Sequence, residues 1–229
     1  LVCVAVSADG RFLAVSDLYE TKLFELKERR TPGAPVELEP RKVKSFGRAF
    51  GGVERVAPSA SALRFSPDST RLVLCSLTGA YVHVLELVSA PNGESCKLLR
   101  SFGQHRRAAA ALHSAEQRQL AGRRGANGES SNGHANGAGE GGDRNERAER
   151  TTTLIQHAEI SCDGAWLSTI SSDLQHHVFS LDSLTYGRTL PSPAALPAGA
   201  AFHPSTASRL SSVLTLVFAD NKIEFWDVE

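Results

Sequence analysis

Acidic side chains recur at two fixed places in this sequence, so a repeated carboxylate is the first candidate for chemistry. The first set lies in short polar phrases such as "SADG" and comprises Asp9, Asp68 and Asp163. The second set follows a nearby apolar run and comprises Asp17, Asp173 and Asp220. Paired carboxylates are the catalytic groups of glycosidases. Catalysis, however, needs dissimilar residues that converge once, whereas one residue type at one repeating place favours a structural role. We therefore predict no catalytic residue.

Thiols and imidazoles are the other groups that could bind a metal or attack a substrate. The four cysteines are separated by 72, 21 and 66 residues and are Cys3, Cys75, Cys96 and Cys162. Metal and redox sites need thiolates a few residues apart or matched by nearby histidines. His176 and His177 are adjacent, but neighbours on a strand point to opposite faces. No nucleotide loop, nucleophile elbow or HExxH motif occurs in the required context. We expect reduced, buried cysteines and predict no metal site and no cofactor.

Length and charge narrow the class of protein. The chain has 229 residues, enough for one large or two small domains, and its 25 basic and 25 acidic side chains balance. A balanced chain attracts nucleic acid or membranes only through local patches. The longest apolar runs, 1–6 and 214–219, fall far short of the roughly 20 residues of a membrane helix. The chain begins at Leu1 and contains no methionine, and we interpret it as a fragment of a longer protein.

The aspartates belong to a unit that occurs four times: an apolar run, a turn, a second run, a second turn and a third run. The first runs of the four copies are "VCVAV", "ALRF", "IQHAEI" and "GAAF". Runs of this length, rich in Val, Leu and Phe and bounded by Gly, Pro, Asp and Ser, predict strands. Asp9-Gly10 and Asp163-Gly164 tolerate positive φ, and Pro67 fixes φ in the turn of the second copy. Each copy is therefore a β-meander.

A candidate fourth strand follows three of the copies, at 41–46, 96–102 and 184–190. The runs 72–75 and 214–218 are continuously apolar, which indicates burial on both faces. Four antiparallel strands per unit, stacked on their neighbours, form the blade of a β-propeller. We predict an all-β β-propeller fragment of about four four-stranded antiparallel blades with a disordered insertion. Residues 1–103 form two blades, 104–150 the insertion, and 151–229 two further blades, the last without its outer strand.

The insertion is rich in Gly, Asn and Ser, and no Val, Ile, Leu, Phe, Trp, Tyr or Cys lies between Leu120 and Leu154. Such a segment cannot bury a core, so we predict disorder at about 122–150. Its first part is basic and carries Arg106, Arg107, Arg118, Arg123 and Arg124. One interpretation is that these arginines form an arm that contacts RNA phosphates or a partner protein. The other is a solvated loop, which is the commoner case for arginines without interleaved aromatic residues. We expect a second basic group, Arg41, Lys42, Lys44 and Arg48, to protect a strand edge.

The fourth copy ends its third run with Trp226-Asp227, and this pair resembles the signature of the WD-repeat propellers. The other copies have Phe24-Glu25, Leu85-Glu86 and Phe179-Ser180 at this place, and the Gly-His signature before the first strand is missing. The second set of aspartates precedes the pair by seven, six and six residues, where the family uses an aspartate to hold the turn. The resemblance implies a structural blade-turn role for Asp17, Asp173, Asp220, Trp226 and Asp227.

Longer phrases resemble a narrower group. "VAVSADGRFLAVSDLYETKLFEL", "HVFSLDSL" and "NKIEFWDVE" are similar to the later propeller of cirhin-type WD-repeat proteins of the small-subunit processome. The resemblance implies a non-catalytic nucleolar scaffold in pre-rRNA processing and ribosome biogenesis. Its partners would be protein subunits of a large complex and pre-ribosomal RNA, with no membrane and no small-molecule substrate. Two alternatives remain open: a WD-repeat adaptor in ubiquitin ligation, trafficking or chromatin, and a propeller enzyme with convergent acids or a metal.

Overall fold

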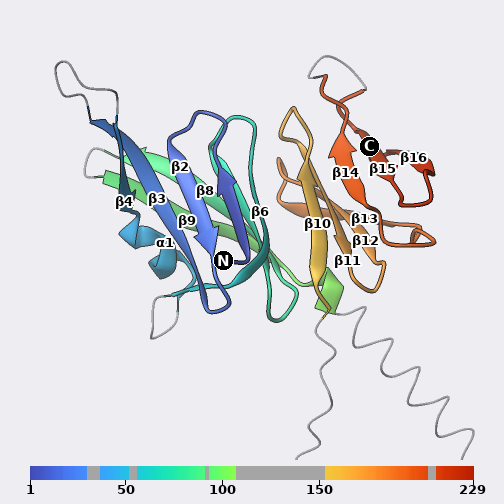
Figure 1. Ribbon diagram of the computed structural model, residues 1–229, viewed down its shortest axis with the longest axis horizontal. Helices are drawn as coiled ribbons and strands as arrows, with labels where there is room; N and C mark the ends of the chain where they lie inside the picture. The colour runs from blue at the N-terminus through green and yellow to red at the C-terminus, as the bar shows by residue number, and fades with distance from the viewer. Residues whose placement is uncertain (30–36, 52–55, 91–92, 107–152, 206–209) are drawn as a thin grey trace, which may run out of the picture.

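Four antiparallel sheets make up most of the computed structural model, which describes residues 1–29, 37–51, 56–90, 93–106, 153–205 and 210–229 (Figure 1). The first sheet contains β1 (Cys3–Val6), β2 (Phe12–Ser16), β3 (Glu20–Arg29) and β4 (Glu37–Lys42), and β5 (Ala57–Pro58) pairs with the start of β3. The second contains β6 (Ala60–Phe65), β7 (Arg71–Ser76), β8 (Val82–Ala90) and β9 (Gly93–Phe102). The third contains β10 (Ile155–Ile160), β11 (Trp166–Ser171), β12 (His176–Ser180) and β13 (Thr185–Leu190). The fourth contains β14 (Gly199–Phe202), β15 (Val213–Val217) and β16 (Ile223–Asp227).

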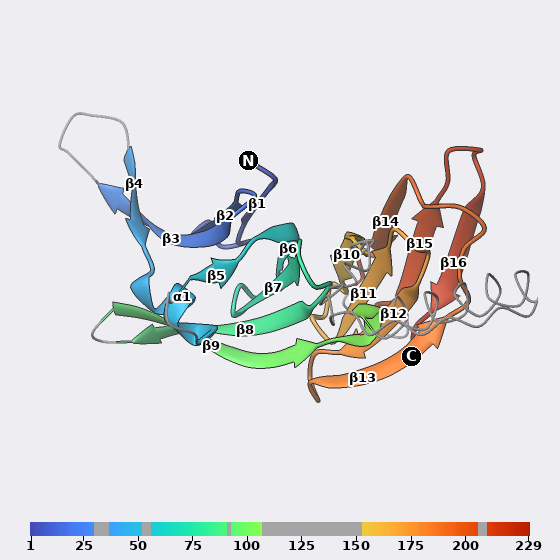
Figure 2. The same cartoon turned by 90° about the horizontal axis from the view of Figure 1, so that it is seen from below.

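Strands that are adjacent in the sequence pair within every sheet, so each sheet is a meander. The inner strands of successive sheets contact one another, because β6 touches both β1 and β10, and β10 touches β14. Figure 2 shows the first sheet stacked over the second in one half of the molecule, and the third and fourth sheets next to each other in the other half. This is the arrangement of consecutive propeller blades, and it confirms the predicted fold. The predicted insertion lies outside the described residues, apart from 104–106.

Three apolar clusters fill the spaces between successive sheets. The first joins Phe12 and Leu23 to Leu72 and Leu85, and the second joins Val73 and other residues of the second sheet to the third. The third lies between the third and fourth sheets and includes Ile170 and Leu214. Burying one such side chain contributes about 1.5–3 kcal/mol. The blades are therefore held together mainly by the layers between them.

The strand β7 is buried on both faces, as its continuous apolar run predicts. Leu72, Val73, Leu74 and Cys75 are each 0 % exposed. The same prediction is wrong for 214–218, because Leu214 and Leu216 are buried while Val217 is 41 % exposed. The fourth sheet packs on the third through one face, and its other face has no neighbouring sheet among the described residues.

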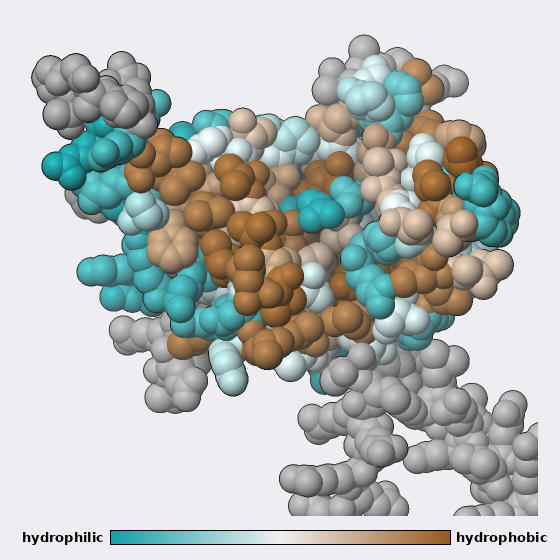
Figure 3. Space-filling model, in the orientation of Figure 1, coloured by the Kyte–Doolittle hydropathy of each residue, from teal (hydrophilic) through white to brown (hydrophobic). Residues whose placement is uncertain are grey.

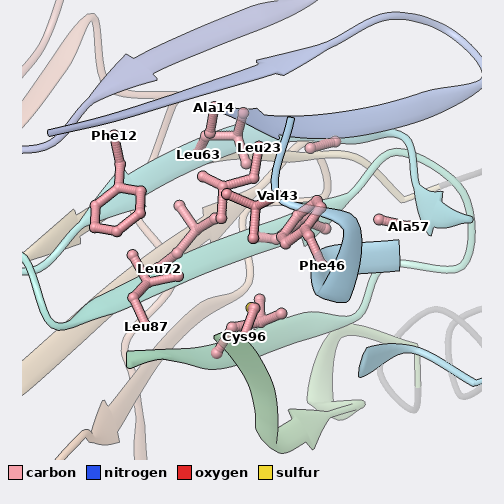
Figure 4. Packing of buried hydrophobic residues seen from close by; sticks show 13 residues of the cluster. Phe12, Ala14, Leu23, Val43, Phe46, Ala57, Leu63, Leu72, Leu87 and Cys96 are labelled. Atoms are coloured by element: carbon pink, nitrogen blue, oxygen red, sulfur yellow. The ribbon is translucent and has the colours of Figure 1, made fainter. Parts of the chain in front are cut away.

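The outer strand predicted at 41–46 is also wrong in part, because β4 ends at Lys42 and the helix α1 (Lys44–Ala49) follows. The N–H of Val43 still donates to the carbonyl of Leu23 at 2.9 Å. The helical turn then brings Phe46, only 2 % exposed, into the cluster beside Leu23 and Val43 (Figure 4). Gly51, with φ of +70°, donates to the carbonyl of Arg48 and ends the helix. A strand continuing along the edge of the sheet would have exposed the Phe46 ring.

Polar contacts also cross each junction between blades. The N–H of Ala60 donates to Ser16 Oγ at 2.7 Å between the first two sheets. Arg64 and Glu159 form a two-pronged pair between the second and third, with the shorter contact at 2.8 Å. The thiol of Cys162 donates to the carbonyl of His203 between the third and fourth. In the part of the chain that the structure describes, no helix is long and apolar enough to cross a membrane.

Candidate interaction site

The first set of aspartates holds the turn between the first two strands of three blades. In the third blade, Ser161 Oγ donates to Asp163 Oδ1 at 2.5 Å and accepts the N–H of Trp166 at 2.9 Å. Asp163 Oδ1 also accepts the N–H of Ala165 at 3.0 Å. The same pattern joins Ser7 to Asp9 and Ser66 to Asp68. Burial raises the pKa of these carboxyls, but the hydrogen bonds outweigh it and leave each pKa below its ordinary value. The carboxylates therefore hold their own turns, and those of Asp9 and Asp163 also accept hydrogen bonds from Ser69 and Ser211 of the next blades.

Removing the serine should weaken such a turn measurably. Ser161 is 0 % exposed, so Ser161→Ala removes the hydrogen-bond acceptor of the half-buried N–H of Trp166 and the hydroxyl that donates to Asp163. We expect a loss of about 1–3 kcal/mol in the free energy of unfolding, measured by urea denaturation. Ser183→Ala is the matched control, because Ser183 is exposed and should change stability by less than about 0.5 kcal/mol. Equal urea midpoints for the two variants would contradict the structural role.

The second set of aspartates and the Trp-Asp pair lie at the turns and ends of the next strands. Asp17 Oδ1 accepts the N–H groups of Tyr19 and Glu20, each at 2.8 Å, and these bonds lower the pKa of Asp17. Asp173 accepts a hydrogen bond from the Ser171 hydroxyl. In the fourth blade, Asp220 accepts the N–H of Lys222, Asp227 accepts from the Ser212 hydroxyl, and Trp226 Nε1 donates to Glu224. These residues occupy separate turns of three sheets, an arrangement suited to scaffolding.

His105 is a structural residue that the sequence pattern did not reveal. It follows β9 of the second blade, is 0 % exposed, and its Nε2 lies 2.9 Å from Thr169 Oγ1 in the third blade. Its ring packs against that of His177 at 4.5 Å between centroids. Burial, together with the neighbouring His177 and His176, lowers the pKa of His105 to about 3. The sequence feature that could have indicated His105 is Gly103-Gln104-His105, which resembles the Gly-His signature expected before the first strand of a blade. The insertion separates it in the sequence from β10, the first strand of the third blade.

Several polar atoms of Gln104, His105 and the hairpin of β11 and β12 are buried without a partner. They are Gln104 Oε1, His105 Nδ1, Asp173 Oδ2, His176 Nδ1 and His177 Nε2. His176 and His177 also make one bond each, to Ser168 at 2.8 Å and to Thr189 at 3.1 Å. Across the described ranges, no group of three or more His, Cys, Asp or Glu side chains is placed to hold a metal. The second and third blades therefore contact each other here through buried polar side chains.

Among the arginines of the basic segment, Arg106 is the one that the structure describes. Its guanidinium lies 4.6 Å from the centroid of the Tyr81 ring and donates to the Tyr81 hydroxyl. Arg106 therefore packs on the second blade although it is exposed. The remaining candidates, Arg107, Arg118, Arg123 and Arg124, lie outside the described residues. The RNA or partner contact expected of the five arginines stays a prediction.

A pocket lies on the first blade where α1 and β5 meet the start of β3. Its volume is about 400 Å³. The floor contains Val43, Phe46 and Ala57, which are 6 %, 2 % and 1 % exposed. Exposed cationic residues stand around it, namely Lys42, Lys44 and Arg48. The combination of an apolar floor and a basic rim is the geometry of a binding site.

Apolar side chains are also exposed on the strands at the two ends of the stack. Val4 and Val6 of β1 are 52 % and 57 % exposed, and Ile223 and Phe225 of β16 are 53 % and 70 % exposed. Figure 3 shows hydrophobic surface gathered over the part of this face where Figure 1 marks the N-terminus, next to β2. Neighbouring blades cover the corresponding surfaces inside the stack. The end blades thus offer surfaces on which further protein could pack.

No family model and no curated protein matches this sequence. Among solved structures, the chain is similar to the β-propeller domain of Cps50 (Swd1) from Myceliophteria thermophila, with a TM-score of 0.53 and 11% sequence identity. The match covers 99% of this chain and 52% of that one, so the chain spans about half the length of this solved propeller. At this identity the likeness supports the fold, which agrees with the sheet order described above.

Proposed function

We propose that this propeller fragment belongs to a non-catalytic WD-repeat scaffold that holds protein subunits of a large complex together. The observation that carries the proposal is the use of the repeated aspartates. Each of Asp9, Asp68 and Asp163 accepts hydrogen bonds from its own turn, and the three lie in three different sheets. Such carboxylates position backbone and do not meet at one substrate. Binding through exposed surface is then the activity that the fold supports best.

The complex that we propose is the nucleolar small-subunit processome, in which the protein would act in pre-rRNA processing. The support is the resemblance of the phrases at 4–26, 177–184 and 221–229 to cirhin-type proteins. In a complete propeller, further blades would cover Val4 and Val6 at one end and Phe225 at the other. Pre-ribosomal RNA is a second proposed partner, through the arginines at 106–124.

The test is affinity purification of the tagged full-length parent protein from cells, with and without ribonuclease. We expect processome subunits and the leader of the pre-ribosomal RNA to co-purify, and the proteins to remain after ribonuclease because protein contacts hold the scaffold. Mock purification from untagged cells is the control. Recovery of ubiquitin-ligase, trafficking or chromatin subunits in their place would end the processome assignment and leave an adaptor of another pathway. A turnover activity lost on mutation of the turn aspartates would contradict the scaffold itself.

A further inference from the structure

The floor of the pocket on the first blade is made of core side chains. Val43 and Phe46 enter the core beside Leu23, as Figure 4 shows, and Ala57 comes from the strand β5. Phe46 is fixed in addition by an edge-on contact with Phe50 at 5.7 Å between ring centroids. Because these side chains belong to the core, the floor keeps its shape when the pocket is empty. The volume of about 400 Å³ accommodates one large apolar side chain with part of its backbone.

The rim is positively charged. Lys44 and Arg48 are four residues apart on α1 and therefore share one face of that helix. Lys42, at the end of β4, lies on the same rim. These three cations form no ion pair with the described residues, whereas Arg41 beside them pairs with Glu39 at 3.4 Å. Glu20 also lines the pocket, but it pairs with Lys22 at 2.7 Å. Among the described residues, the positive charge of the rim is therefore not compensated.

Protection of a strand edge, the role expected for this basic group, fits Arg41 and Lys42 on the outer strand β4 but does not account for Lys44 and Arg48. The outer strand ends at Lys42, and Lys44 and Arg48 stand on a helix, which has no free edge to protect. A solvated basic surface would not need an apolar floor beneath it. The charges and the cavity are explained together by a ligand that is acidic and carries an apolar group.

We propose that this pocket binds an acidic segment of a partner protein, with one aromatic or large aliphatic side chain inserted into the cavity beside the exposed Val56 and flanking carboxylates paired with Lys44 and Arg48. The proposal rests on the scaffold function but not on the processome assignment. A peptide fits the observations better than RNA, because single-stranded RNA binds by stacking bases on exposed aromatic rings. Phe46 is 2 % exposed and cannot serve as such a platform.

Fluorescence anisotropy with the purified full chain tests this. The probe is a synthetic, fluorescein-labelled peptide of nine residues, with a central Phe between runs of Asp and Glu. The variant is Lys44→Glu/Arg48→Glu, and the matched control is Lys97→Glu/Arg100→Glu, which reverses two exposed cations on β9 and changes the net charge equally. We expect the pocket variant to bind the peptide about tenfold more weakly than the control does. Replacing the central Phe by Ala should weaken binding to the unmodified chain by about tenfold as well.

Three results would overturn the proposal. The first is equal binding to the pocket variant and the control, which would mean that only net charge matters. The second is no measurable binding of the acidic peptide to the unmodified chain. The third is tighter binding of a ten-nucleotide oligouridine than of the peptide, with the oligouridine binding abolished by Lys44→Glu/Arg48→Glu. The thermal unfolding midpoints of both variants should lie within a few degrees of that of the unmodified chain. A loss of binding can then not be attributed to a loss of folding. Since the assay uses purified protein, its failure is separate from a failure to co-purify processome subunits.

Discussion

Phe179→Ala is expected to lower the free energy of unfolding by about 3–5 kcal/mol. Phe179 lies on β12 and is 0 % exposed. Its ring packs against Phe102 of the second blade at 4.6 Å between centroids and against Tyr186 of its own blade at 5.8 Å. The truncation removes the transfer free energy of the ring and leaves a cavity between two blades. Urea denaturation followed by circular dichroism measures the loss.

Phe225→Ala is the matched control, because it makes the same chemical change on a strand where Phe225 is 70 % exposed. We expect this control to change stability by no more than about 0.5 kcal/mol. Similar losses in the two variants would show that the layer between the second and third blades does not hold the fragment together. A biphasic transition in Phe179→Ala would show further that the two pairs of blades unfold separately.

Acidification from pH 7 to pH 5 is expected to destabilise the protein strongly. Burial lowers the pKa of His83 to about 4, of His105 to about 3 and of His176 to about 4. These histidines are neutral in the folded state, whereas in the unfolded chain they take up a proton below about pH 6.5. The unfolded state then binds more protons, so stability is complete above about pH 6.5 and falls as the pH drops toward the folded values. The slope is about 1.4 kcal/mol per pH unit for each histidine.

The urea midpoint at pH 7.5, 6.5, 5.5 and 5.0 measures this effect. The lowered pKa values of Asp9, Asp68 and Asp163 affect stability mainly below about pH 4, so the range from 6.5 to 5.0 reports on the histidines. Within the series, His83→Gln should flatten the dependence, because one of the buried imidazoles is removed. A midpoint that does not change between pH 6.5 and 5.0 would contradict the buried, neutral state of these rings.

Local chemistry predicted most of the strands because hairpins are short-range structures. The turns at Asp9-Gly10 and Asp163-Gly164 are set by their own residues, with Gly10 at φ +71° and Gly164 at φ +79°. In the second blade Ser69 takes the positive φ, at +60°, which the Pro67 signal did not reveal. The helix at Lys44–Ala49 was missed because it forms to bury Phe46, and that gain depends on tertiary contacts.

The candidate sites were harder to predict because they join residues far apart in the sequence. The rim of the pocket was visible as a basic group, but its floor requires β5 to pair with β3, and Ala57 is 36 residues from its partner Thr21. His105 meets Thr169 across 64 residues. The triplet Gly103-Gln104-His105 indicates His105 but not its partner Thr169, and no local pattern indicates that Ala57 pairs with Thr21, so periodicity and turn chemistry cannot find either contact.

The anchoring of His105 has a consequence for how the protein can change in evolution. His105 contacts Thr169, and Leu154 exchanges hydrogen bonds with Ser172 at 2.7 and 3.1 Å, so residues on both sides of 107–152 are fastened to the same hairpin. Closing a loop between fixed ends costs an entropy that grows only with the logarithm of its length, about 0.6 kcal/mol for each doubling. With the disorder that the sequence predicts for about 122–150, we expect mutations that lengthen or shorten that stretch to be nearly neutral for folding, so that it can diverge while the blades on either side keep their register.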